Sequence, residues 1–229
     1  MKKLLTILSL LIIISCSKEI ELDQIVERGG LSYEVNNEKP FTGTTLSYHP
    51  NGQLESRIKY KNGLKDGLSE SFHENGQLES RIKYKNGSHV DGQVEIFYKN
   101  GTLESKTNYK DGQLDGLSEF FYEIERAYPR GVIDKMMTKE NYKDGQLHGL
   151  RESFRDGTLR SKENYKDGQL DGLSEFFYED GTLESKENYK DGQLDGLSEF
   201  FYEDGTLRRK YCYRMSKLNP IHCHKNEKI

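Results

Sequence analysis

The sequence predicts an all-β protein: an elongated, single-sheet antiparallel meander or solenoid of about seven β-hairpin repeats, each about 24 residues long. The first observation is internal identity, because Ser161 to Leu183 is identical to Ser185 to Leu207, one repeat further along the chain. The second is a set of glycines that recurs with the same period. The third is a composition with 22 glycines and 15 tyrosines but only four prolines and no tryptophan. A fixed period of this size is typical of repeat architectures, in which each unit contacts its neighbours.

The composition also limits the class of protein. The 229 residues are 33% hydrophobic and 31% charged, which argues against a large aliphatic core. It suits short strands whose aromatic side chains supply the buried area. The formal net charge of -4 argues against a nucleic-acid partner, because phosphate binding requires clustered basic charge.

Each unit opens on a marker glycine. In most units a second glycine follows nine residues later and a tyrosine eight residues after that, with a third glycine three residues beyond the tyrosine. Successive marker glycines are one period apart to within one residue, except for a longer interval after the fourth. These glycines are Gly43, Gly67, Gly92, Gly116, Gly149, Gly172 and Gly196. The pattern divides each unit into two strands and two turns.

The unit from Gly172 to Asp195 shows this division. Its aromatic run Leu173 to Tyr178 is strand-like, and Leu183 to Tyr189 returns as the second strand. Between them, Asp180-Gly181 predicts a two-residue hairpin turn with positive φ at both residues. Asp191-Gly192 then begins the connection to the next unit.

The turn positions predict the register of each hairpin. In this unit the expected opposite pairs are Tyr178 and Leu183, Glu175 and Lys186, and Gly172 and Tyr189. In the second unit they are His73 and Leu78, Glu70 and Arg81, and Gly67 and Tyr84. Opposite charges on paired positions contribute roughly 0.2–1 kcal/mol each. Seven units predict about fourteen strands, coiled by strand twist.

The N-terminus predicts a targeting segment, residues 1–15. Lys2 and Lys3 precede an apolar run that is too short to span a bilayer, as in a secretory signal peptide. The residues Ile13-Ile14-Ser15-Cys16 resemble a bacterial lipobox, which implies cleavage before Cys16 and lipidation of that cysteine. The alternative is a leader that is cut elsewhere. Lipidation predicts a protein of the bacterial cell envelope, anchored to a membrane on its outer-membrane, periplasmic or surface side.

The remaining chain divides into four parts: a lipid-anchored tether (16–29), an N-terminal cap half-repeat with Asn36-Asn37 at its turn (30–42), the repeat array (43–213) and a C-terminal tail or cap (214–229). Cys212 and Cys223 could form a disulfide, worth roughly 2–3 kcal/mol in the chain-entropy model. The competing interpretation, a metal site with His222 and His224, matches no zinc spacing, and no metal site is predicted.

A family resemblance rests on the string Lys190-Asp191-Gly192-Gln193-Leu194-Asp195-Gly196 followed by Asp204-Gly205. It resembles the glycine skeleton of MORN repeats, and in particular the bacterial MORN variant, whose members often carry the label of YwqK-type antitoxins. The resemblance extends from Phe41 to Tyr213. It implies a β-sheet repeat scaffold with no catalytic residues to carry over.

The side chains that could carry chemistry follow the repeat. His49 and His73 stand where other units have tyrosine, and His148 stands where other units have aspartate, so a structural role is expected for each. The carboxylates recur in every unit, whereas a catalytic pair needs two different environments. The loop Asp191 to Asp195 lacks the ligand density of calcium loops. We therefore expect no enzyme and no cofactor.

One segment interrupts the period. The fourth unit carries nine extra residues around positions 124–137, a segment that contains Tyr128, Pro129, Arg130, Met136 and Met137. An expanded hairpin tip in a uniform sheet is a candidate contact loop. It is equally compatible with a tolerated insertion, since loop tips accept added residues.

These observations predict a non-enzymatic, lipid-anchored envelope protein that acts as a protein-interaction scaffold. Its expected partners are a membrane, through Cys16, and a protein. One alternative is an antitoxin or immunity-like component that neutralises a partner protein, and another is a module that binds an envelope lipid headgroup or glycan.

Overall fold

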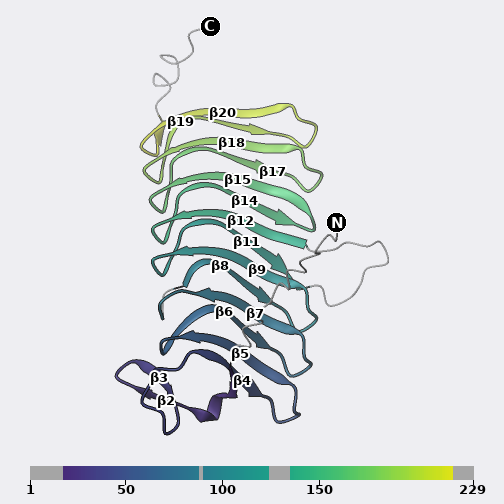
Figure 1. Ribbon diagram of the computed structural model, residues 1–229. Helices are drawn as coiled ribbons and strands as arrows, with labels where there is room; N and C mark the ends of the chain where they lie inside the picture. Colours follow the sequence, from purple (N-terminus) through teal and green to yellow (C-terminus); the bar gives the residue numbers. More distant parts are fainter. Residues whose placement is uncertain (1–17, 88–89, 124–134, 219–229) are drawn as a thin grey trace, which may run out of the picture.

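The computed structural model describes residues 18–87, 90–123 and 135–218. Over these residues the chain forms one long sheet of stacked hairpins, a small two-stranded sheet and a single 3-10 turn, with no α-helix (Figure 1). No helix in this part of the chain is long and apolar enough to cross a membrane.

The fourteen long strands that were predicted are present. They are β4 (Gly43–Tyr48), β5 (Leu54–Lys61), β6 (Leu64–Phe72), β7 (Leu78–Tyr84), β8 (Val90–Phe97), β9 (Leu103–Lys110), β11 (Gly116–Tyr122), β12 (Lys135–Lys143), β14 (Gly149–Arg155), β15 (Thr158–Lys166), β17 (Gly172–Phe177), β18 (Leu183–Lys190), β19 (Gln193–Phe201) and β20 (Leu207–Arg214). Each pairs antiparallel with the next in chain order. Short strands complete the connections: β10 (Gln113–Leu114), β13 (Gln146–Leu147), β16 (Gln169–Leu170) and β21 (Lys217–Leu218).

The predicted register is confirmed at the charged and glycine positions. Glu175 pairs with Lys186, and Gly172 pairs with Tyr189. Extended over the whole sheet, the register produces one alternating row of charges on a single face, here called the charge ladder. Its members are Arg57, Glu70, Arg81, Glu95, Lys106, Glu119, Lys139, Glu152, Lys162, Glu175, Lys186, Glu199 and Lys210.

The predicted pairing next to the hairpin tips is wrong by one residue. Phe177, not Tyr178, pairs with Leu183, because a bulge falls between Phe176 and Phe177. The same bulge places Phe72, not His73, opposite Leu78. An extra residue on one strand shifts every later pair.

The turn prediction is also corrected. At the tip only Gly181 has a positive φ (86°), and the Tyr178 amide donates to the Thr182 carbonyl at 2.9 Å. The Asp180 carboxylate accepts from the Thr182 amide and hydroxyl at 2.9 and 2.6 Å, which favours a longer turn ending in a left-handed glycine. Two-residue turns with two positive φ angles occur instead in the connections, as at Asp191-Gly192 (48° and 76°).

The marker glycines bend the strands. Within β6, Gly67 has a φ of 111°, and Gly196 within β19 has a φ of 112°. Residues with a Cβ rarely adopt this region, so the glycine is required by the backbone. A Cβ at Gly196 would also lie 3.3 Å from that of Asn188. The bent strands stack into the curved array in Figure 1.

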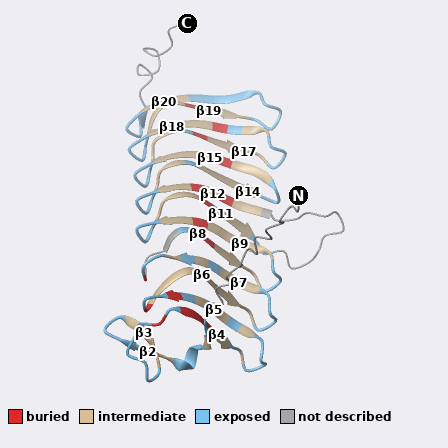
Figure 2. Cartoon of the chain, viewed as in Figure 1, coloured by how far each residue is buried: buried red, intermediate tan, exposed pale blue. Residues whose placement is uncertain are grey.

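The face opposite the charge ladder, here called the buried face, contains the core. Its most buried side chains are small: Thr45, Ser118, Ser174 and Ser198 are at most 1% exposed. They lie in one column along the middle of the strands, and Figure 2 shows such buried segments recurring along the array. Beside them runs a column of tyrosines paired with the marker glycines. Tyrosine rings therefore cover the glycines and flank the small residues. This arrangement lets a sheet with no second layer bury apolar area on one face.

A cap covers the N-terminal edge. Strand β1 (Glu19–Glu21) pairs parallel with β4, and after the turn η1 (Leu22–Gln24) come β2 (Ile25–Arg28) and β3 (Leu31–Glu34), which form the small sheet. Phe41 is 4% exposed and packs 5.8 Å from the Tyr60 ring. The cap is thus longer than predicted: it begins at β1, inside the segment that was predicted as the tether (16–29), and not at residue 30.

Candidate functional site

The hairpin tips are connected from one unit to the next by a repeated hydrogen bond. In each case a ring at the end of one hairpin donates to a backbone carbonyl of the next unit. The bonds are His49 Nε2 to Phe72 O (2.7 Å), His73 Nε2 to Phe97 O (2.9 Å), Tyr98 Oη to Phe121 O (2.8 Å) and Tyr178 Oη to Phe201 O (2.8 Å). The structure therefore gives the two histidines a structural position equivalent to that of the tyrosines, and their donation to carbonyls requires the Nε2-protonated tautomer.

This row of bonds is broken next to the insertion. Tyr122 holds the donor position in the fourth unit but is 42% exposed and makes no such bond among the described residues. The fifth unit has Arg155 in this position, and its tip is one residue shorter, with a two-residue turn at Asp156-Gly157 (φ 55° and 79°). Two consecutive tips therefore lack the bond.

A cavity of about 430 Å³ lies at this break, and we call it the tip cavity. It is bordered by aromatic and apolar side chains with charged groups among them: Tyr122, Met137, Thr138, Ser153, Phe154, Arg155, Arg160, Phe176, Phe177, Glu179 and Glu184. Arg160 Nη2 lies 3.5 Å from Glu179 Oε1, but the buried Arg160 Nε has no hydrogen-bond partner within the described part of the chain. The cavity therefore offers aromatic surface together with unsatisfied donor capacity.

Two of the five predicted contact residues can be located. Met136 pairs with Phe121 in β12, and Met137, the residue at the bulge, borders the tip cavity. Tyr128, Pro129 and Arg130 lie outside the described residues. The insertion and the tip cavity are thus adjacent in the chain. The sequence alone indicated only that the period is interrupted here.

Of the three predicted cysteine sites, one lies within the described residues. Cys16 and Cys223 lie outside the described residues. Cys212 is 8% exposed and takes part in a disulfide. Its pairing with Cys223 stays a prediction.

A charged triad lies deeper on the buried face, two residues inward from the tip cavity. Arg151 stands in the middle column, where the next two units have serine. Its Nε donates to Glu140 Oε1 at 3.0 Å and its Nη1 to Glu163 Oε2 at 2.7 Å. Burial opposes the charged guanidinium, but these two carboxylates raise the pKa of Arg151. One arginine therefore neutralises two glutamates that are each 12% exposed.

A tyrosine hydroxyl adds to these carboxylates. Tyr142 donates to Glu140 Oε2 at 2.6 Å, and in the sixth unit Tyr189 donates to Glu187 Oε2 at 2.5 Å. Burial, followed by the bond to the carboxylate and its charge, raises the pKa of both tyrosines far above the usual range. These hydroxyls are thus donors, and they stabilise the carboxylates instead of acting as bases.

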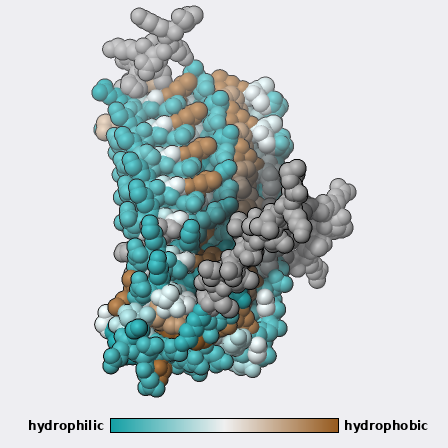
Figure 3. Space-filling model, in the orientation of Figure 1, coloured by the Kyte–Doolittle hydropathy of each residue, from teal (hydrophilic) through white to brown (hydrophobic). Residues whose placement is uncertain are grey.

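Within the described ranges, no three His, Cys, Asp or Glu side chains are placed to hold a metal ion. His148 Nδ1 lies 3.2 Å from Asp167 Oδ1 on the exposed connections. What the structure offers is a regular surface with a local cavity, as the repeated apolar patches between polar side chains in Figure 3 also indicate.

Comparison with known families agrees with this geometry. Five segments of the chain match the MORN repeat variant, at residues 41–62, 65–86, 90–111, 170–191 and 194–215. These five segments are similar to MORN repeats of the variant type. The matches bear out the resemblance to the MORN variant over these five segments, and such arrays are typically binding modules without catalytic residues. The antitoxin label and the bacterial origin stay predictions. The stretch between the matches, 112–169, contains the insertion, the shortened tip and the Arg151 triad. No curated protein matches the chain.

Proposed function

We propose that this MORN repeat protein is a non-enzymatic interaction scaffold that binds a protein partner at the tip cavity. The observation that carries the proposal is the coincidence of three features at one place: the broken row of tip bonds, the cavity and the inserted segment. A uniform array offers the same surface in every unit. A specific partner needs a unique surface, and the tip cavity provides one.

The chemistry of the cavity defines the partner. Phe154, Phe176 and Phe177 provide apolar surface. Of the charged groups beside it, Glu179 pairs with Arg160 Nη2, while Arg160 Nε, which has no hydrogen-bond partner among the described residues, keeps a free donor for a carboxylate. Aromatic and arginine side chains around a pocket are typical of the residues that dominate binding energy at protein interfaces. The expected partner segment therefore presents an apolar or aromatic side chain next to a carboxylate.

The proposed location is the bacterial envelope, with the array anchored through lipid on Cys16. The support is the sequence: a basic start, an apolar run and a lipobox-like ending at Cys16. The described residues begin at position 18, and the first strand of the cap starts at Glu19, a few residues after the proposed anchor. Loss of membrane attachment in a Cys16→Ala variant would support the anchor.

The test places a photo-crosslinking amino acid at position 122 in cells that express the full chain. The matched control places it at position 202, because Tyr202 has the same position in the last unit and is similarly exposed, at 51%. We expect one protein to crosslink at 122 and not at 202. A second variant replaces residues 124–135 with the Asp-Gly-Thr of the sixth unit, which restores the normal tip length. It should fold and should lose the crosslink.

Two results would contradict the proposal. Equal crosslinking at 122 and 202 would indicate a surface without specificity. Retention of the crosslinked protein by the trimmed variant and by an Arg160→Ala variant would show that the tip cavity is not the contact.

A further inference from the structure

The tyrosine column of the buried face changes chemistry in one place. In five connections a leucine pairs with the tyrosine of the preceding strand: Tyr109 with Leu114, Tyr142 with Leu147, Tyr165 with Leu170, Tyr189 with Leu194 and Tyr213 with Leu218. In the first connection Lys65 pairs with Tyr60. Because five of the other six connections have leucine at this position, leucine is sufficient for packing against the tyrosine, and a lysine is not required there.

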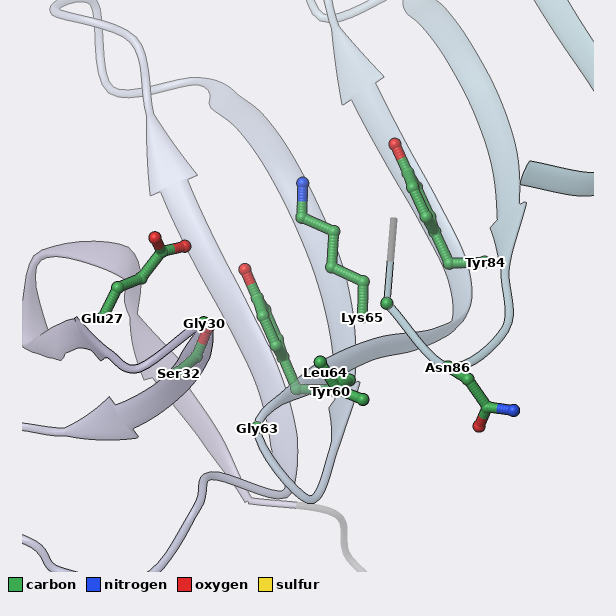
Figure 4. A pocket seen from close by; sticks show the side chains of 10 residues that line it. Glu27, Gly30, Ser32, Tyr60, Gly63, Leu64, Lys65, Tyr84 and Asn86 are labelled. Carbon is green, nitrogen blue, oxygen red and sulfur yellow. The ribbon is translucent and has the colours of Figure 1, made fainter. Parts of the chain in front are cut away.

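Lys65 borders a cavity of about 380 Å³ between the cap and the array, which we call the cap cavity. The cap contributes Glu27 and Ser32, and the array contributes Tyr60, Lys65 and Tyr84. Figure 4 shows the Tyr60 and Tyr84 rings on either side of Lys65. The two phenol oxygens, the ammonium and the Glu27 carboxylate all point to the same side of the cavity (Figure 4).

The walls of the cap cavity are held by backbone bonds. The Ser32 amide donates to the Gly63 carbonyl at 2.8 Å, and the Gly63 amide donates to the Phe41 carbonyl at 2.7 Å. A Cβ at Gly63 would lie 3.0 Å from Leu31 and from the Ser32 carbonyl, so the cap fits closely against this connection. The polar ends are therefore carried by elements that are fixed relative to one another.

The two charged groups line the same cavity but form no salt bridge with each other. Lys65 Nζ lies 5.2 Å from the centroid of the Tyr84 ring, a cation–π contact that orients the ammonium. Neither Lys65 nor Glu27 forms a salt bridge with any residue that the structure describes. Both remain available to a ligand.

We propose that the cap cavity binds a sugar acid, that is, a monosaccharide unit that carries a carboxylate. The ligand carboxylate would pair with Lys65, and its hydroxyls would donate to Glu27 and exchange hydrogen bonds with the two tyrosine hydroxyls. Aromatic walls with a few convergent polar groups are typical of small-molecule sites, and about 300–1,000 Å³ is their usual size. Glu27 sets the orientation, because it repels the carboxylate and accepts the hydroxyls. The inference does not depend on a partner at the tip cavity.

The test is titration calorimetry of the full-length chain with glucuronate, with glucose and inorganic phosphate as comparison ligands. We expect glucuronate to bind at least tenfold more tightly than either. Lys65→Leu gives the first connection the residue that five of the other six connections contain, so the variant should fold, and it should lose at least this tenfold preference. Glu27→Gln should weaken glucuronate, which loses its hydroxyl acceptor, but should not weaken phosphate.

A matched gain of charge completes the test. Leu194→Lys places an ammonium in the corresponding connection of the sixth unit, away from the cap, and should create no second glucuronate site. The proposal is overturned if Lys65→Leu binds glucuronate as tightly as the unchanged chain does. It is also overturned if phosphate matches glucuronate, since the cavity would then bind any small anion.

Discussion

Replacing Arg151 with serine tests the charged triad directly, because serine is what the next two units have at this position. The change removes two charge-assisted bonds, of 3.0 Å to Glu140 and 2.7 Å to Glu163. It leaves two carboxylates that are each 12% exposed on the same face without a cation between them. The variant therefore keeps the shape of the repeat but loses its local charge balance.

The magnitude follows from burial. Breaking a buried ion pair by removing one partner costs about 3–5 kcal/mol. The Arg151 side chain is itself 28% exposed, and the Tyr142 hydroxyl still donates to Glu140, so the lower end of this range applies. We expect a loss of about 3 kcal/mol in the free energy of unfolding at pH 7.

The assay is urea unfolding at pH 7 and at pH 4, with hydrogen exchange to locate the effect. In an array of nearest-neighbour contacts the loss should concentrate in the strands β12, β14 and β15. Acid should shrink the difference between the variant and the unchanged chain, since protonated carboxyls no longer need the guanidinium. The matched control is Lys186→Ser on the charge ladder, whose 40% exposed side chain lies 3.5 Å from Glu175 and should contribute less than about 1 kcal/mol. A loss for Arg151→Ser below that of the control, or one that is equal at both pH values, would refute the reasoning.

Three further predictions concern the repeat itself. Tyr178→Phe removes a tip bond of 2.8 Å and should cost about 1 kcal/mol in urea unfolding, whereas Tyr202→Phe in the last unit, for which no such bond is found within the described residues, should have no measurable effect. Gly172→Ala places a Cβ on a backbone with φ of 107° and should cost about 1–2 kcal/mol, with no cost expected from an alanine at an exposed strand position. Because the pKa of Tyr189 is raised in the folded state, this tyrosine contributes stability that is complete below about pH 10 and is lost as the pH rises towards the folded-state pKa. The Tyr189→Phe variant lacks this contribution. Its free energy of unfolding should therefore decline less steeply between about pH 9 and 11.

Much of the fold could be predicted from the sequence because the repeat supplies its own alignment. The pair of Glu175 with Lys186 could be predicted within one hairpin, whereas the pairing between successive hairpins that completes the charge ladder is a finding of the structure. The turn at Asp180-Gly181 could not be decided in this way. An Asp-Gly pair suits a two-residue turn, but the Asp180 carboxylate bonds to Thr182 and stabilises a longer one.

The candidate sites were harder to predict, because they depend on which face of the strand each side chain occupies. Both faces of the repeat carry charged residues, so the sequence does not show which of two neighbours, Lys162 or Glu163, faces the core. In the structure Glu163 is in the triad on the buried face, and Lys162 is in the charge ladder. Arg151 was the available signal: it interrupts a column of small residues. The tip cavity had no sequence signal beyond the insertion, because it results from the absence of a side-chain bond between two hairpins.

The departures from the repeat separate structural residues from functional ones in this chain. In an array with a fixed period, a side chain that packing requires recurs, as the leucines of the connections do. A side chain that stands alone must either compensate another change or bind something else. Arg151 compensates, because it pairs with Glu140 and Glu163. Lys65 compensates no carboxylate that the structure describes, and it borders a cavity. That difference is the physical reason to look for a ligand at the first connection and for a stability effect at the fifth unit. The two variants should therefore behave in opposite ways. Lys65→Leu should change binding without loss of stability, whereas Arg151→Ser should lower stability without loss of binding at the cap cavity.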